Sequence, residues 1–189
     1  MRKLTYYVGV SLDGFIAGPG GEIDFYPVSD DHVASMVEQY PEVLPTHLRR
    51  ALGVDDRPNR RFDTVVMGWD TYRPALELGI GSPYAHLRQV VASRTRSPDD
   101  PAVEHTTDAL ATVRDLKGEQ GADVWLAGGG GLARSLVDEI DELVVKVYPV
   151  LAGAGIGVLG GEFSPRAFRL TDSRTFDSGA VVLSYARER

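Results

Sequence analysis

Hydrophobic residues recur along the chain at two spacings, which predict strands and helices in alternation. Short apolar runs predict buried strands at residues 4–11, 62–68, 88–94, 124–127 and 143–150. Apolar residues three and four positions apart predict helices that begin near Ser29, Gly68, Thr107 and Gly131. Near the C-terminus, strand-like residues 168–176 and 180–185 flank Asp177-Ser178-Gly179, which is typical of a hairpin turn. This order predicts an α/β domain whose sheet is mostly parallel, with an antiparallel C-terminal edge.

Residues 41–61 break the pattern. They hold three prolines and five arginines with little periodicity, so we expect an irregular excursion with one helical piece at residues 46–52. A linker between two domains is the alternative, but the segment before it is too short to fold alone. With 189 residues in all, the chain is expected to form a single domain over residues 1–189.

Composition and charge limit the classes of partner. The net charge is −7, which argues against nucleic acid or an anionic membrane as the main partner, because both require a basic surface. An anionic small molecule stays open, since its site is local. The chain has no cysteine, which excludes a thiolate nucleophile and a cysteine-based zinc site. It also lacks an apolar leader or membrane-length segment, so we expect a cytoplasmic protein.

Four consecutive glycines, Gly128 to Gly131, follow the apolar run 124–127 and precede a helical pattern. Glycines let the backbone approach a ligand closely, and a helix start offers free N–H groups to an anion. A phosphate-bearing cofactor is therefore the expected occupant. A crowded strand-to-helix turn without a ligand is the alternative, but four glycines exceed what a turn requires.

Gly68, Ser93 and Gly128 each follow a predicted strand. Because the carboxyl ends of parallel strands meet at one edge of a sheet, these positions should line a single crevice. The four histidines show no metal-ligand spacing, so no metal is expected, and surface positions or loop hydrogen bonds are the expected roles of His32, His47, His86 and His105.

Several separated segments resemble the dihydrofolate reductase-like superfamily, in the family's order. They are Ser-Leu-Asp-Gly-Phe-Ile-Ala at residues 11–17, Met-Gly-Trp-Asp-Thr-Tyr at 67–72, Val-Ala-Ser-Arg at 91–94, the glycine turn after Trp125, and Leu-Ala-Gly-Ala-Gly at 151–155. The first segment is similar to the branch that contains the reductase domain of the bifunctional riboflavin-biosynthesis deaminase/reductase. The resemblance covers nearly the whole chain except residues 40–61, and it implies the three-layer fold of that superfamily.

The resemblance also implies a nicotinamide cofactor, with NADPH favoured over NADH. It implies that Ile16 packs beside the nicotinamide and that Ser93 and Arg94 meet the adenosine 2′-phosphate. A solvated surface charge is the alternative for Arg94. The backbone around the pyrophosphate would come from Gly68, Thr71, Gly128, Gly129, Gly130, Gly131 and Leu132. Trp69 stands where the family has a basic residue, so one cationic contact to phosphate is missing.

On the substrate side, members of this superfamily place an acid near the start of the first helix. Asp30 is the expected proton donor, because a carboxylate facing an apolar pocket can share a proton with a ring nitrogen. The alternative is that Asp30 only caps the helix and that Asp31 lies in its solvated first turn. Asp31, Asp13 and Tyr26 complete the expected substrate contacts, although Asp13 could instead order its own loop. The acid that riboflavin-type reductases carry shortly after the threonine is absent from Thr71-Tyr72-Arg73-Pro74.

These observations predict a reductase that transfers a hydride from NADPH to a small heterocycle of the pterin, folate or ribosylamino-pyrimidine type, with residues 13–21 as a lid. The alternative is a nucleotide-binding module with the same fold and no catalytic turnover. It is supported by the proton donor, because Asp30 could instead only cap the helix. The resemblance to the riboflavin-type branch also implies a homodimer.

Overall fold

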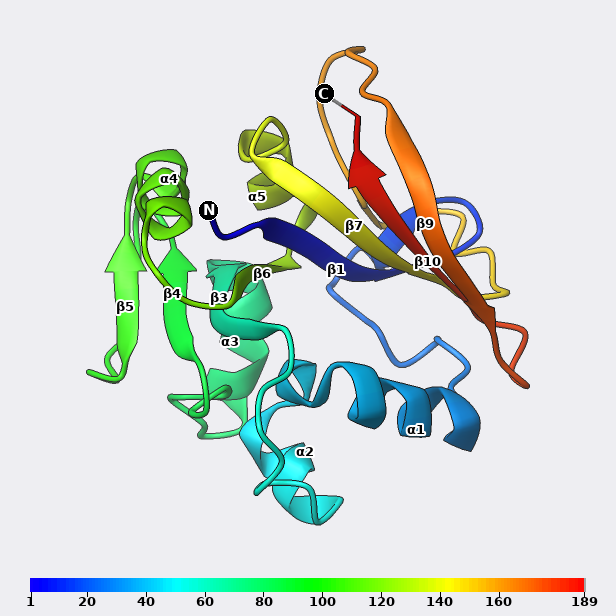
Figure 1. The fold of residues 1–189 in the computed structure, drawn as a ribbon, viewed down its shortest axis with the longest axis horizontal. Helices are drawn as coiled ribbons and strands as arrows, with labels where there is room; N and C mark the ends of the chain where they lie inside the picture. The colour runs from blue at the N-terminus through cyan, green and yellow to red at the C-terminus, as the bar shows by residue number, and fades with distance from the viewer. Residues whose placement is uncertain (189) are drawn as a thin grey trace.

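The structure, a computed structural model, describes residues 1–188. One sheet of eight strands runs through the molecule in the order β5-β4-β3-β6-β1-β7-β10-β9 (Figure 1). Its strands are β1 (Leu4–Val10), β3 (Phe62–Gly68), β4 (Arg88–Ala92), β5 (Val103–Thr106), β6 (Asp123–Gly128), β7 (Ile140–Val147), β9 (Phe168–Thr175) and β10 (Val181–Arg187). The helices are α1 (Asp30–Gln39), the 3₁₀ helix η1 (Pro41–Val43), α2 (Thr46–Ala51), α3 (Trp69–Glu77), α4 (Ala109–Gly118) and α5 (Gly130–Ser135).

The first six strands of that order are parallel, and β10 pairs antiparallel with both β7 and β9. This arrangement confirms the predicted mostly parallel sheet with an antiparallel C-terminal hairpin. Two short strands lay outside the prediction: β2 (Phe15–Ala17) and β8 (Ile156–Gly157) pair antiparallel in a separate ribbon. The expected loop after β1 is therefore partly strand, held by a distant segment of the chain.

Helices cover both faces of the sheet, because the central strands are apolar on both sides. On one face, Tyr6, Val8 and Leu126 pack with residues of α4 and α5. On the other face, Tyr7 and Trp125 pack with residues of η1 and α3 and with Met36 of α1. The alternation of Tyr6 and Tyr7 between the two cores is the two-residue period of a strand. The result is three layers, with the sheet in the middle (Figure 1).

The excursion at residues 41–61 contains the predicted helical piece, α2, and is fixed by two buried charged side chains. The Glu42 carboxylate is 0% exposed and accepts hydrogen bonds from the backbone N–H groups of Arg60, Arg61 and Phe62, at 3.2, 2.8 and 2.9 Å. The Arg49 guanidinium donates to backbone carbonyls within the same segment, including that of Pro41 at 2.6 Å. Both buried charged side chains thus have hydrogen-bond partners, and they hold the segment together with its buried apolar residues.

None of the helices formed by residues 1–188 has the length and apolar character needed to cross a bilayer.

Candidate active site

The candidate site lies where the chain order of the sheet reverses. Strand β1 has β6 on one side, with β3, β4 and β5 beyond it, and β7 on the other, with β10 and β9 beyond it. In open α/β sheets, ligands bind outside the carboxyl ends of the strands at such a reversal. The β1–β6 ladder ends at Tyr6 and Leu126, although β1 runs on to Val10 and β6 to Gly128. The two strands therefore part at the edge where the site is expected.

Segments from three strand ends meet at this edge. A Cβ atom built on Gly68 would lie 3.9 Å from the Gly128 oxygen, and one built on Gly129 would lie 3.8 Å from Cδ1 of Ile16 and 3.9 Å from Oγ1 of Thr71. Gly128 has φ +126°, a conformation that a residue with a side chain rarely adopts. The structure thus brings together Gly68, Thr71, Gly128, Gly129 and Ile16, and Leu132 lies within the same range of Gly68.

The remaining two glycines of the turn differ from each other. A Cβ atom on Gly130 would lie 2.1 Å from the backbone oxygen of Gly157, so this glycine is required for the packing of α5 against β8. A Cβ atom on Gly131 would meet no atom within 4 Å. Gly130 therefore has a packing role that the sequence did not indicate, whereas Gly131 faces open space beside the first turn of α5.

The segment after β4 places a second arginine against the site. The Ser93 hydroxyl accepts from the backbone N–H of Arg96 at 3.1 Å, so it orders its own loop. Arg94 is exposed and has no partner among residues 1–188. The guanidinium of Arg96 lies 5.6 Å from the centre of the Trp69 ring, a cation–π contact at the start of α3. The indole N–H of Trp69 is buried and has no hydrogen-bond partner within the described chain.

Sequence reasoning missed this Arg96–Trp69 pair. Trp69 stands where the family has a basic residue. The only sign in the sequence that a different segment supplies a positive charge there is the pair of arginines in Arg94-Thr95-Arg96. The resulting contact puts positive charge beside the first turn of α3, whose own arginine, Arg73, pairs with Asp70 and Glu77 of the same helix.

The loop between β1 and α1 is fastened at both ends. Asp13 accepts hydrogen bonds from Ser11 Oγ at 2.6 Å and from the backbone N–H groups of Ala152 and Gly153 at 3.0 and 2.7 Å. These bonds, led by that of Ser11, lower the pKa of Asp13 to about 2. Asp13 therefore orders its loop and is ionised at neutral pH. The Tyr26 hydroxyl donates to the Phe15 carbonyl at 2.8 Å.

The two acids at the start of α1 have different surroundings. Asp30 is the first residue of the helix and is exposed. Asp31 accepts from Ser29 Oγ and from the backbone N–H of Asp177 at 3.0 Å, so it ties α1 to the β9–β10 hairpin. These bonds, led by that of Ser29, hold the pKa of Asp31 below its ordinary value. Neither carboxylate is buried under the helix, and the proton-donor role of Asp30 stays a prediction.

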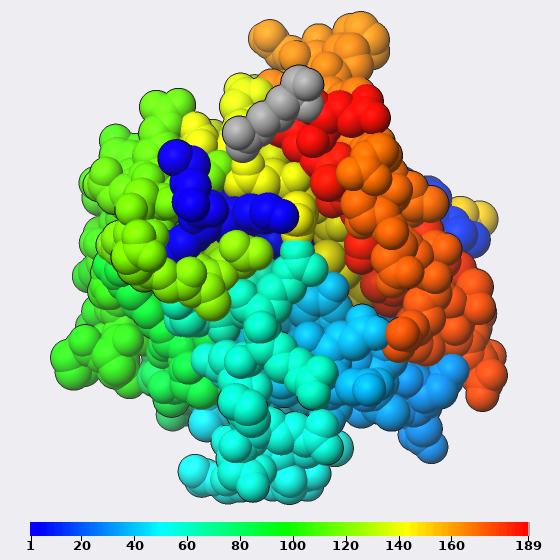
Figure 2. Space-filling view, in the orientation of Figure 1, coloured from blue at the N-terminus to red at the C-terminus, as the bar shows by residue number. Residues whose placement is uncertain are grey.

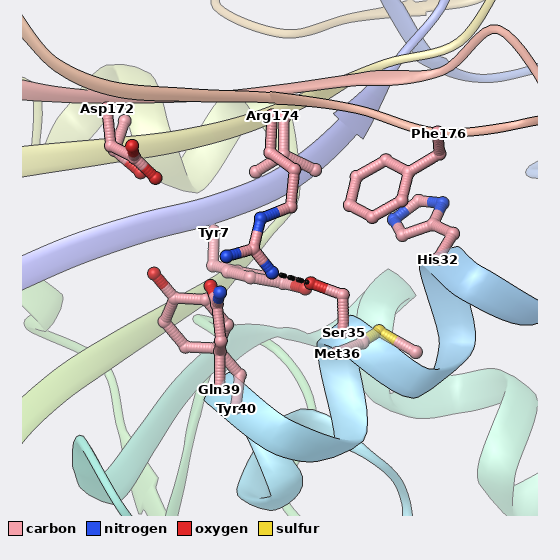
Figure 3. A pocket seen from close by; sticks show the side chains of 11 residues that line it. Tyr7, His32, Ser35, Met36, Gln39, Tyr40, Asp172, Arg174 and Phe176 are labelled. Carbon is pink, nitrogen blue, oxygen red and sulfur yellow. Dashed lines mark hydrogen bonds between the residues drawn. The ribbon is translucent and has the colours of Figure 1, made fainter.

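The residue that α1 directs into the protein is His32. It is 3% exposed, which makes the expectation of a surface or loop position wrong for this histidine. Its ring stacks on Phe176 of the hairpin at 4.5 Å between centroids (Figure 3). The apolar residues Val33, Met36 and Val37 predicted the helix correctly but not which side chain would be buried most deeply. His86 and His105 do form loop hydrogen bonds, in which the Nε2–H group of each donates to a backbone carbonyl, that of Glu42 and that of Ser93 respectively.

Residues 1–188 contain no group of three or more histidine, aspartate or glutamate side chains that could hold a metal ion.

Comparison with known proteins identifies the family and the relatives of the chain. The model of the RibD C-terminal domain matches residues 2–182. The chain is 32% identical over 192 residues to the uncharacterized protein YwjB of Bacillus subtilis strain 168, with 98% of each protein covered. It is 26% identical over 198 residues to the uncharacterized protein YyaP of the same organism, covering 97% of this chain and 94% of YyaP.

Solved structures show the same fold. A putative riboflavin biosynthesis protein from Shewanella sp. PV-4 superposes with a TM-score of 0.72 at 23% identity, over 100% of both chains. A Thermotoga maritima diaminohydroxyphosphoribosylaminopyrimidine deaminase/5-amino-6-(5-phosphoribosylamino)uracil reductase superposes with a TM-score of 0.66 at 16% identity, over 99% of this chain and 57% of that one. The expected resemblance is thereby confirmed, and the reductase-like fold is shared. The chain belongs to the RibD C-terminal domain family.

Proposed function

We propose that the protein is an NADPH-dependent reductase that transfers a hydride to a small planar heterocycle. The observation that supports this most is the meeting of Gly68, Thr71, Gly128, Gly129 and Ile16 at the reversal point of the sheet, in a chain of the RibD C-terminal domain family. The Thermotoga maritima neighbour is named as a uracil-type reductase, which makes a nitrogen heterocycle the natural acceptor class.

The residues at this edge fit a dinucleotide phosphate. The first N–H groups of α3 and of the glycine turn have no partner within their own helices. Gly131 adjoins open space, and the buried indole N–H of Trp69 has no partner within the described residues. In the proposed complex, Thr71 and the backbone of Gly129 to Leu132 hold the pyrophosphate region, and Arg94 meets the adenosine 2′-phosphate.

The reduced nicotinamide supplies the hydride when it is bound. The chain's own residues position the two rings and exclude water. Ile16 packs beside the glycine turn and gives that position an apolar wall. The loop that contains it is fastened by Asp13 to residues 152–153, so the wall is preorganised.

The test combines binding and turnover. Protein is mixed with NADPH and with candidate pterins, folates and pyrimidines, and absorbance is followed at 340 nm. Oxidation of NADPH that depends on both protein and acceptor supports the proposal. The second candidate, a nucleotide-binding module without turnover, is favoured by the exposed position of Asp30. Tight NADPH binding with no oxidation in the presence of any acceptor would support that alternative.

A further inference from the structure

Strand β9 forms one outer edge of the sheet (Figure 1). Among residues 1–188 its only neighbour in the sheet is β10, and its side chains from Arg169 to Thr175 are all exposed. Such an edge presents a row of unpaired backbone groups, which is a template for pairing with a further strand. Charged side chains on an edge strand commonly prevent that pairing by repulsion, so the order of charges along β9 is informative.

The charges of β9 and of the turn after it are arranged symmetrically about Ser173. Asp172 comes one position before Ser173, and Arg174 comes one position after it. Arg169 comes four positions before, and Asp177 four positions after. Each basic residue thus has an acidic counterpart at the same distance on the other side of Ser173. None of these four side chains forms an ion pair within residues 1–188. This order suits an identical strand that runs in the opposite direction.

The direction of the backbone groups is compatible with such a pair. The Phe176 N–H donates to the Ala180 carbonyl at 3.0 Å, so these residues form a hydrogen-bonded pair within the hairpin. Hydrogen-bonded and non-hydrogen-bonded pairs alternate along an antiparallel ladder, and the register of β9 with β10 is regular from Thr175 back to Asp172. The N–H and C=O groups of Thr175 and Ser173 therefore point to the open edge.

A single register pairs both opposite charges. In a two-fold antiparallel pair centred on Ser173, Asp172 of each copy lies opposite Arg174 of the other. A centre on Asp172 or on Arg174 places two like charges opposite each other, which is destabilising. A centre on Thr171 or on Thr175 leaves both charges opposite uncharged residues. A centre midway between two residues sets groups that point to the edge against groups that point to β10.

The surroundings of Arg174 leave its charge available to a second copy. Its guanidinium donates to Ser35 Oγ at 2.9 Å and lies against the Gln39 amide, so both of its partners are neutral (Figure 3). Asp172 and Arg174 line the same hollow between α1 and β9, on the α1 side of the sheet. Residues directly opposite in an antiparallel pair project from the same face, so Asp172 of a second copy would meet Arg174 there.

We propose that β9 pairs with β9 of a second copy of this chain, antiparallel and centred on Ser173, so that the two eight-stranded sheets become continuous. Exposed ion pairs contribute little energy, so backbone hydrogen bonds supply the affinity and the charges select the register. The register of β9 with β10 shifts between Asp172 and Leu170, which limits regular pairing to residues 171–175. The family resemblance implies a homodimer, and the edge charges assign an interface and a register to it.

Cysteine cross-linking tests the register. The chain has no cysteine, so each introduced thiol is the only one present. Ser173→Cys should form a covalent dimer under mild oxidation, because the two-fold axis places its two Cα atoms about 5.5 Å apart. Thr171→Cys should stay monomeric on a non-reducing gel, since its two copies would lie about 14 Å apart along the strands. Ser97→Cys, at an exposed position far from β9 in the sheet, is the control for random collision.

Sedimentation equilibrium of charge variants tests the ion pairs, and thermal melting reports whether each variant keeps its fold. Asp172→Arg and Arg174→Asp should each raise the dimer dissociation constant by about tenfold or more, because two attractive pairs become repulsive. The double variant exchanges the charges and should return to within about threefold of the wild type. Asp115→Arg, at an exposed position of α4, is the control for a change in net charge and should leave the constant nearly unchanged.

Rescue of dimerisation by the double variant, together with selective cross-linking of Ser173→Cys, would support the proposed pairing. A wild-type protein that stays monomeric at all concentrations would overturn it. A dimer whose dissociation constant is the same in both single charge variants, or in which Ser173→Cys cross-links no better than Ser97→Cys, would equally overturn it.

Discussion

Single side chains around the proposed cofactor site differ in how firmly they are held. Arg96 is placed by its contact with Trp69, whereas Arg94 is exposed and has no partner among the described residues. A free guanidinium can turn toward an added phosphate, but one that stacks on a ring helps to hold that ring in place. The two arginines, only two positions apart, should therefore act differently on cofactor binding.

Arg94→Ala should weaken NADPH binding by about tenfold and leave NADH binding nearly unchanged, because only NADPH carries the 2′-phosphate. Arg96→Ala should weaken both nucleotides to a similar degree, since it loosens Trp69 at the start of α3. Isothermal titration with each nucleotide measures both effects. Equal losses of NADPH and NADH in Arg94→Ala would refute its 2′-phosphate role.

Lys146, on β7, should make the stability of the protein depend on pH. Its side chain is partly buried, with the ammonium nitrogen 4.5 Å from the centre of the Tyr7 ring. Burial lowers the pKa of Lys146 to about 8 in the folded protein against an ordinary value of 10.5, so between these values the unfolded chain binds more protons than the folded one. Stability therefore rises with pH in that window, and the penalty of the partly buried ammonium is fully present below pH 8. The neighbouring groups Tyr7, Tyr148 and His32 are neutral at pH 8 to 10. They are present in both the wild type and the Lys146→Met variant, so the difference in stability between the two proteins reports on the lysine.

Urea unfolding of the wild type and Lys146→Met at pH 7, 8, 9 and 10 tests this linkage. The free energy of unfolding of the wild type should increase relative to that of the variant as the pH increases from 8 to 10. Parallel stability curves for the two proteins across this range would show that burial does not lower the pKa of the lysine.

At the scale of elements, two glycines of the turn that precedes α5 have different roles. Gly130 is fixed by its approach to β8, and Gly131 borders open space. Gly130→Ala should lower the free energy of unfolding by about 1–3 kcal/mol, because the new methyl group meets a backbone oxygen that cannot move far. Gly131→Ala should change it by less than about 1 kcal/mol, since alanine favours the helix that begins there.

Urea unfolding compares the two variants, and NADPH titration adds a second measurement. Gly131→Ala should weaken NADPH binding despite its normal stability, because the methyl group occupies space that the cofactor needs. A stable Gly131→Ala protein with unchanged NADPH affinity would remove this residue from the proposed site.

The excursion at residues 41–61 is held by the Glu42 carboxylate as well as by buried apolar residues such as Val43, Leu44 and Val54. Glu42→Ala leaves the backbone N–H groups of Arg60, Arg61 and the buried Phe62 without their acceptor and should lower the free energy of unfolding by about 3 kcal/mol. Glu38→Ala, at an exposed position of α1, is the control and should change it by less than about 0.5 kcal/mol. A small effect of Glu42→Ala in urea unfolding would mean that the segment is held by other contacts.

The elements that the sequence predicted well are those whose signal is local. The strand period, the glycine after β3 and the turn at Asp177 to Gly179 each specify structure within a few residues. Contacts between distant segments carried no such signal. The hydrogen bonds of Glu42, the position of Arg96 over Trp69, and the stacking of His32 on Phe176 arise only after the sheet has assembled. The sequence pattern did not predict that His32 is the buried residue of α1, because histidine is treated as polar when apolar positions are sought.

At the scale of the whole molecule, the sheet sets where chemistry can occur. Its reversal point beside β1 gathers the strand ends. Helix α1 covers one face and lies against the β9–β10 hairpin at the sheet edge, where Figure 2 shows the surface of α1 against that of β9. Strand β9 is an edge strand and is exposed along nearly all its length. The homodimer implied by the family resemblance remains a prediction, which analytical ultracentrifugation of the intact chain checks directly.

The central claim is that three strand ends form one dinucleotide site. Isothermal titration of the purified protein with NADPH and then with NADH tests it most directly. We predict a saturable 1:1 binding heat with a dissociation constant below about 100 µM for NADPH, and weaker binding of NADH. The absence of any binding heat with both nucleotides would contradict the account.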